Sequence, residues 1–145
     1  MVRSKLWAAQ DALYALLGAA SGLDAAQVTI GRPTKDDTDN VWVSGEVSDW
    51  LAEYQVSGLK AKDETFVLRV VVLAVRLGTD YVKVRDVVKA YGQAVEDVVA
   101  DNPTLTGTVM LAQIRNARIE ETLTDERHRA VQLTIDIECR AWLDS

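Results

Sequence analysis

Residues Val131 to Leu143 alternate strictly between apolar and polar side chains, with Trp142 as the one exception. They read Val-Gln-Leu-Thr-Ile-Asp-Ile-Glu-Cys-Arg-Ala-Trp-Leu, which puts seven apolar residues on one face. A period of two predicts an antiparallel strand with one face in water. Such a strand would extend about 43 Å, whereas a compact domain of this length is about 38 Å across. We therefore expect either a bulge that breaks the strand or a contact beyond its own domain.

Length and composition predict one soluble globular domain over residues 1–145. The chain has 48% hydrophobic and 26% charged residues, which are ordinary globular values. A net charge of −6 disfavours a protein that grips DNA, because like charges repel the phosphate backbone. The absence of a long apolar run argues against a membrane segment, and the N-terminus does not resemble a secretory signal. We expect synthesis in a bacterial cytoplasm.

The order of patterns predicts an α+β fold with an antiparallel or mixed β-sheet. A helix over Ser4–Leu17 and a longer one at about 80–101, ending before Asn102-Pro103, should pack against the sheet. Val28–Ile30 and Asn40–Val47 are strand candidates, and Glu53–Ser57 continues or pairs with the latter. Thr65–Arg76 is apolar on both faces apart from Arg69 and suits a central strand, for which we expect a helix of this chain on one face and a neighbouring subunit as a candidate cover for the other. Val109–Leu123 and Val131–Leu143 should form a long terminal hairpin with its tip near 124–127.

The sequence contains no constellation that favours an enzyme, a metal site or a cofactor. Cys139 lies on the apolar face of its strand and suits a small buried residue. His128, flanked by two arginines, is a conceivable general base, but a histidine at a turn is the simpler interpretation. The acidic run at 36–39 lacks calcium-loop spacing. Glu120 and Glu121 are neighbours on a strand, so they should point to opposite faces.

The candidates for an oligomer or partner interface are aromatic and charged residues at strand positions that should face solvent. Trp142 falls in the polar phase of the last strand, and Trp42 opposes its valine neighbours. Tryptophan in such a position favours interfaces, where its apolar body is covered. The alternative, which stays open, is that Trp142 folds under the N-terminal helix near Trp7. The full candidate set is Trp142, Arg140, Glu138, Trp42, Arg69, Arg115 and Arg118.

The chain resembles the tail terminator proteins of long-tailed, siphovirus-type bacteriophages, particularly those of actinobacterial phages. The resemblance lies in length, acidity and element order: the Ser4–Leu17 helix, a central β-rich segment, a long helix before Asn102-Pro103, and a hairpin ending Cys139-Arg140-Ala141-Trp142-Leu143. It implies a non-enzymatic virion protein that forms a homo-oligomeric, hexameric ring in the tail or neck. Such a ring caps the tail-tube protein, ends tail elongation and meets the head–tail connector or stopper, while DNA passes through its lumen unbound.

Three alternatives remain from the residues themselves. The first is another head–tail neck component, such as a stopper or completion protein. The second is a small cytosolic α+β domain that binds a ligand between the sheet and the Asp80–Asp101 helix. The third, an enzyme using His128, has the least support.

Overall fold

The computed structural model describes residues 4–34, 39–46, 48–54, 61–78, 80–123 and 128–142. These residues form two α-helices, one short 3-10 helix and six strands. In chain order the elements are α1 (Leu6–Ala19), η1 (Ser21–Leu23), β1 (Gln27–Ile30), β2 (Asn40–Val43), β3 (Ser48–Tyr54), β4 (Ala61–Leu77), α2 (Tyr81–Asp101), β5 (Leu111–Leu123) and β6 (His128–Trp142).

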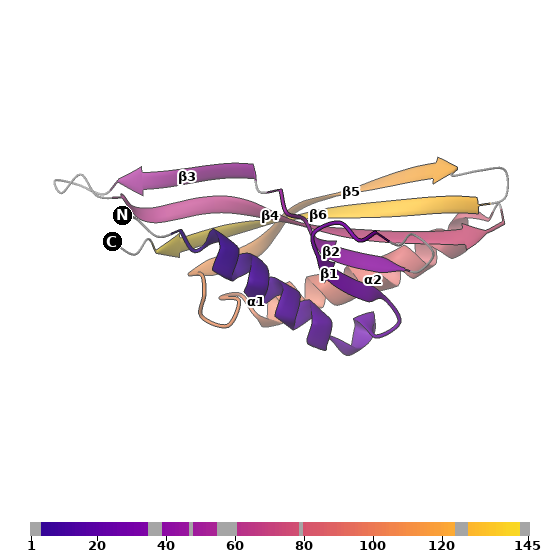
Figure 1. Ribbon diagram of the computed structural model, residues 1–145, viewed down its shortest axis with the longest axis horizontal. Helices are drawn as coiled ribbons and strands as arrows, with labels where there is room; N and C mark the ends of the chain where they lie inside the picture. The colour runs from indigo at the N-terminus through magenta and orange to yellow at the C-terminus, as the bar shows by residue number, and fades with distance from the viewer. Residues whose placement is uncertain are drawn as a thin grey trace.

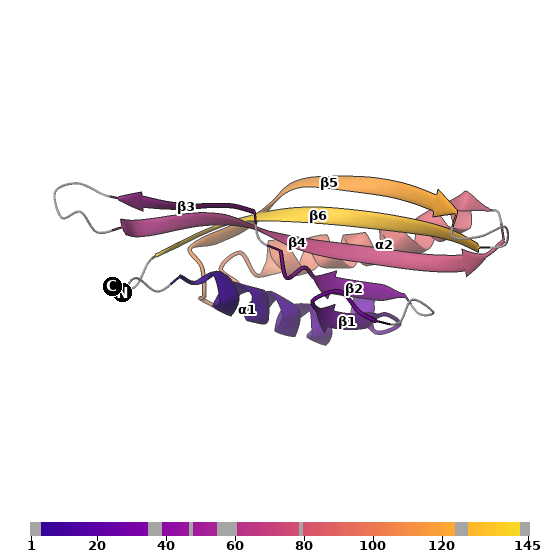
Figure 2. The same cartoon turned by 45° about the horizontal axis from the view of Figure 1, so that its top comes forward.

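The strands form one mixed sheet in the order β1-β2-β4-β6-β5. β1 and β2 pair in parallel, and the other pairings are antiparallel. β3 pairs with the first part of β4, while β2 pairs with its later part. Both helices lie against one face of this sheet, which Figures 1 and 2 show from two directions. The predicted α+β class, with its long C-terminal hairpin and two packing helices, is confirmed.

The pairing of β4 with β6 has no register break over fifteen residue pairs, from Asp63↔Trp142 to Leu77↔His128. A ladder of that length extends about 50 Å. The expected bulge is absent from β6 and occurs instead in its partner β5, between Ile114 and Asn116. The domain accommodates the strand by being elongated (Figure 1). The size estimate was wrong because it assumed a sphere.

The core lies between the helices and the face of the sheet that they cover. α1 contributes Leu13 and Leu17, and α2 contributes Val88 and Val95. The opposing strand residues alternate: Phe66, Leu68, Val70, Val72 and Ala74 come from β4, and Val131, Leu133, Ile135, Ile137, Cys139 and Ala141 come from β6. α2 is rich in valine, a mediocre helix former, so this packing holds it in place. Among the described residues no helix is both long and apolar enough to span a membrane.

Several predicted boundaries and one pairing need correction. α1 begins two residues later and ends two residues later than Ser4–Leu17. β2 ends at Val43, so the predicted strand Asn40–Val47 is too long, although Val47 itself lies outside the described residues. The next strand, β3, pairs with β4 and not with β2. Residues 55–57 and the hairpin tip at 124–127 also lie outside the described part.

A buried carboxylate on β4 fixes the start of α1. Glu64 has no exposed surface, and its carboxylate oxygens accept three hydrogen bonds. The donors are Ser4 Oγ (2.8 Å), the backbone N–H of Lys5 (2.5 Å) and Trp50 Nε1 of β3 (2.7 Å). Ser4 Oγ in turn accepts from the N–H of Leu6 at 3.1 Å. One side chain therefore satisfies an N–H at the start of α1 and ties that helix to two strands.

A second buried polar cluster joins the start of β2 to β4 and α2. Asp39 is 7% exposed and accepts a bidentate pair of hydrogen bonds from Arg76, one of them 2.8 Å long. Tyr91 Oη donates to the same carboxylate at 2.7 Å. Burial, followed by the hydrogen bond to Asp39, raises the pKa of Tyr91 to about 12. Asp39, the one residue of the acidic run at 36–39 that the structure describes, therefore joins β2 to β4 and α2.

Two glycines should respond in opposite directions to alanine. At Gly92 an added Cβ would lie 2.5 Å from Leu133 Cδ2, while at Gly18 nothing lies within 4 Å. We expect Gly92→Ala to lower the free energy of unfolding by about 1–2 kcal/mol, because overpacking exceeds the gain in helix propensity. Gly18→Ala should raise it by about 0.5 kcal/mol. Urea denaturation measures both, and effects of the same sign would contradict the close crossing of α2 over β6.

Candidate functional site: the uncovered face of the sheet

The face of the sheet opposite the helices carries most of the charged side chains of β4, β5 and β6. Among the described residues no helix covers it, as both views show (Figures 1 and 2). Pairing in register brings the outward-pointing residues side by side: Arg69 faces Asp136, Val67 faces Glu138 and Thr65 faces Arg140. On the next strand Arg118 faces Thr134. We call this surface the outer face.

The outer face brings together six of the seven residues that the sequence singled out. Arg69, Glu138 and Arg140 belong to β4 and β6. Arg115, at the β5 bulge, lines a shallow hollow with Glu138, Thr65 and Val67. A second hollow, on the same face, contains Trp42, Arg69 and Arg118.

Opposite charges on the outer face are paired. Arg69 Nε lies 3.0 Å from Asp136 Oδ1, which it faces across the ladder. This hydrogen bond is the main reason that the pKa of Arg69 is raised. Arg140 lies 2.9 Å from Asp63, whose carboxylate is almost fully buried. Arg118 lies 2.9 Å from Glu120, with both side chains at least half exposed. Only the Arg118–Glu120 pair is exposed on both sides, and such a pair contributes little stability.

Three apolar side chains of the outer face are buried beneath these charged side chains. Val67, Val71 and Trp42 are 3%, 6% and 6% exposed although no helix lies over them. Trp42 shares its hollow with Arg69 and Arg118, and the aliphatic stems of arginine can cover apolar surface while their charged ends stay in water. The prediction that Trp42 sits in the outward phase is confirmed, because it faces Val71 in register. Its own chain nevertheless covers it.

The other three tryptophans are more than half exposed. Trp7 is 69%, Trp50 51% and Trp142 56% exposed. They belong to the first turn of α1, to β3 and to the last residue of β6, and Figure 1 shows the start of α1, β3 and the end of β6 toward the same end of the molecule. Trp7 and Trp50 were not among the predicted interface residues. Adjacent Trp50 and Leu51 offered a signal, because two consecutive large apolar residues on a strand cannot both face the core.

Trp142 lies beside the N-terminal helix, as one of the two alternatives expected. Its side chain lines a hollow with Lys5, with Ala8 of α1 and with residues 107–110. More than half of its surface still meets solvent. The first helix therefore flanks Trp142 without covering it.

The described residues bring no candidate chemistry together. They contain no cluster of three or more metal-ligating side chains. Burial, with a smaller effect of the Glu138 charge, raises the pKa of the Cys139 thiol to about 12, so the thiol stays protonated and unreactive. Glu120 and Glu121 point to opposite faces, as predicted, and pair separately with Arg118 and Arg129. Core side chains fill most of the space between α2 and the sheet, but a groove of about 410 Å³ remains between the end of α2 and β5, so a ligand site there stays a prediction.

No protein-family model matches this chain, and no curated protein does. Its fold is similar to that of a chain in a solved structure of the virion of a native gene transfer agent particle. The two chains superpose with a TM-score of 0.53 at 17% sequence identity. The similarity covers 91% of this chain and 94% of the other, so it includes nearly the whole fold and not one shared motif.

Proposed function

We propose that this protein is a virion structural protein, a tail terminator whose subunits form a hexameric ring in the neck of a phage-like particle. In this proposal residues 1–145 form a single tail-terminator-like domain. The ring caps the tail-tube protein, ends tail elongation and joins the tail to the head connector. The observation that carries the proposal is the fold shared from end to end with a virion chain of a gene transfer agent.

Physical features of the chain support this role. A net charge of −6 suits a ring through which DNA passes without binding. The elongated body and the uncovered outer face provide large surfaces for protein contacts (Figure 2). We assign contacts with the neighbouring neck components to the outer face, through Arg69, Arg115, Arg118, Glu138 and Arg140. Trp142, half exposed at the end of β6, would contribute apolar area at the rim.

The assembly test measures the mass of the purified chain by light scattering, followed by electron microscopy. We expect a particle of about six times 16.0 kDa that appears as a closed ring, or a ring that forms when purified tail tubes are added. A chain that stays at 16.0 kDa at high concentration and does not attach to tail tubes would contradict the proposal. Attachment to the portal side of the neck instead of the tube would identify a stopper.

A second measurement tests the assigned surface. Arg118→Glu should weaken attachment of the ring to tail tubes by at least tenfold. The variant places a second carboxylate beside Glu120 and reverses the charge that this position presents to the partner. Asp11→Lys, an exposed change of equal size on α1, is the matched control and should leave attachment unchanged. Equal attachment by both variants would remove the outer face from the proposal.

A further inference from the structure

The charges of α2 run in the order that opposes the helix dipole. Its first half, residues 81–90, exposes Lys83, Arg85 and Lys89 against the single carboxylate of Asp86. The first turn has no acidic residue and the last turn has no basic residue. Because the N-terminal end of a helix is the positive pole of its dipole, this order destabilises α2. Asp80 serves only as the cap, accepting from the N–H of Val82 at 3.0 Å.

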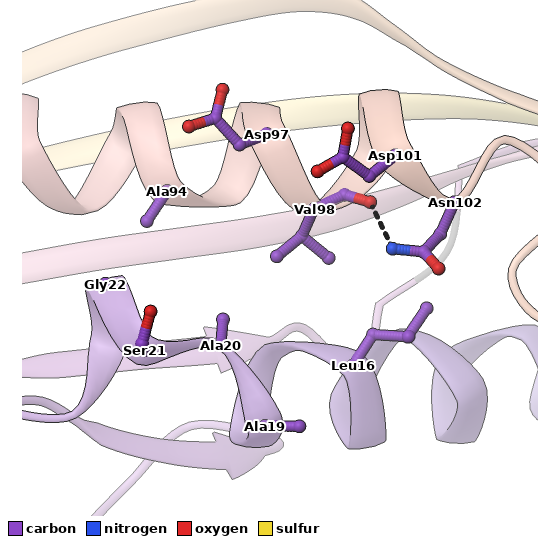
Figure 3. A pocket seen from close by; sticks show the side chains of 10 residues that line it. All are labelled: Leu16, Ala19, Ala20, Ser21, Gly22, Ala94, Asp97, Val98, Asp101 and Asn102. Atoms are coloured by element: carbon purple, nitrogen blue, oxygen red, sulfur yellow. Dashed lines mark hydrogen bonds between the residues drawn. The ribbon is translucent and has the colours of Figure 1, made fainter.

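The second half of α2 is acidic and open to solvent. Residues 91–101 expose Glu96, Asp97 and Asp101 and contain no lysine or arginine. In Figure 3 Val98 points toward α1, and Asp97 and Asp101 line a hollow that α2 shares with the end of α1 and with η1. Asp97 also accepts a hydrogen bond from Gln93 Nε2 at 3.1 Å. This half of α2 therefore presents three carboxylates to solvent, and Glu96 is the one that lines the groove described next.

The two ends of α2 also differ in shape. At the basic end Val82 is 47% exposed beside these cations. At the acidic end a groove of about 410 Å³ lies between α2 and β5. Val82 and Ala100 are five helical turns apart, so they lie on one line of the helix about 27 Å from each other. The groove is lined mainly by apolar residues, with Glu96 at its side: Val99, Ala100, Pro103, Ala112 and Ile114.

We propose that the acidic half of α2 and its groove receive the basic half of α2, with Val82, from a second copy of this chain. Charge complementarity identifies the occupant, because the same helix presents a cationic apolar projection at one end and an anionic apolar groove at the other. A contact between different patches of identical subunits repeats from copy to copy and closes into a ring when the rotation permits. This inference rests on the proposed ring and names the contact between adjacent subunits.

Charge reversal at each end, alone and in combination, tests the contact. In K83E/K89E both ends of α2 are acidic, and in E96K/D101K both ends are basic. We therefore expect light scattering to give each variant the monomer mass of 16.0 kDa. An equimolar mixture of the two should assemble again, with the variants alternating around an even-numbered ring. The fourfold variant K83E/K89E/E96K/D101K should assemble on its own. Raising the salt concentration should weaken assembly of the wild type.

Two controls separate a loss of folding from a loss of assembly. The reversals move acidic residues to the positive end of the helix dipole and basic residues to the negative end, so the melting temperature should stay the same or rise. Assembly of K83E/K89E and E96K/D101K at the wild-type mass, or failure of their mixture to assemble, would overturn the α2 contact and leave the proposed ring standing. A wild-type chain that neither assembles nor attaches to tail tubes would overturn both.

Discussion

Replacing Glu64 with alanine is expected to lower the free energy of unfolding by about 3 kcal/mol. The carboxylate is fully buried and accepts hydrogen bonds from Ser4, the Lys5 N–H and Trp50. Each buried donor that loses its acceptor costs about 1–3 kcal/mol, although the half-exposed indole of Trp50 can recover a bond to water. The variant also frees the start of α1 from β4. Urea denaturation followed by circular dichroism measures the change.

Graded variants separate this cluster from a general effect of losing a carboxylate. Glu64→Gln keeps one acceptor oxygen and should lose about half as much stability. Trp50→Phe removes only one donor and should cost about 1 kcal/mol. Glu120→Ala, in an exposed pair with Arg118, is the control and should change stability by less than about 0.5 kcal/mol. An effect of Glu64→Ala no larger than that of Glu120→Ala would show that the cluster does not anchor α1.

Replacing Asp39 with alanine is expected to have an effect of similar size, about 3 kcal/mol. The carboxylate of Asp39 is buried, but the side chain of Arg76 is 42% exposed and can bind water, so the loss comes mainly from broken hydrogen bonds and not from an unpaired buried charge. Here the guanidinium of Arg76 and the hydroxyl of Tyr91 both lose their acceptor. Tyr91→Phe, which removes one hydrogen bond to a carboxylate, should cost about 1.5 kcal/mol. Thermal or urea unfolding of the three proteins at neutral pH checks the order.

The Asp39 effect should also depend on pH, with a predictable sign. Burial raises the pKa of Asp39, but hydrogen bonds from Arg76 and Tyr91 and the charge of Arg76 lower it more, to below its ordinary value of 3.8. The stabilisation is therefore complete above about pH 5 and is lost as the pH falls through the folded-state pKa. The difference in stability between wild type and Asp39→Asn should shrink from about pH 5 toward pH 2. A constant difference over that range would contradict the lowered pKa.

The sequence predicted the long strands and the pairing of the C-terminal hairpin, but not the other strand partners. Alternation in Val131–Leu143 and the two-sided apolar run Thr65–Arg76 correctly indicated β6 and β4. Periodicity states which face a residue occupies and leaves the neighbouring strand undefined. For that reason β3 was assigned to the wrong partner. The Glu64 cluster was not predictable, because its donors come from positions far apart in the chain.

The candidate site, like the fold, could be predicted from the sequence only in part. Alternation along the last strand placed Glu138 and Arg140 on one face, and the register with β4 adds Arg69 to that face, which the sequence did not indicate. The alternation of side chains along a strand could not show that Trp42 is covered by its own chain. Residues of other strands, among them Arg69 of β4 and Arg118 of β5, share its hollow. Alternation also could not reveal that Trp7 and Trp50 are exposed at the same end as Trp142. Whether these residues contact partners stays a prediction.

The unbroken pairing of β4 with β6 has a mechanical consequence. A force applied between the two ends of the elongated body loads all fifteen residue pairs in shear at once. A force that pulls the edge strand β5 away from β6, across the strands, instead breaks the residue pairs one after another. The subunit should therefore resist stretching along its strands far better than peeling of its edge strand. The long axis is the direction in which this subunit can carry load.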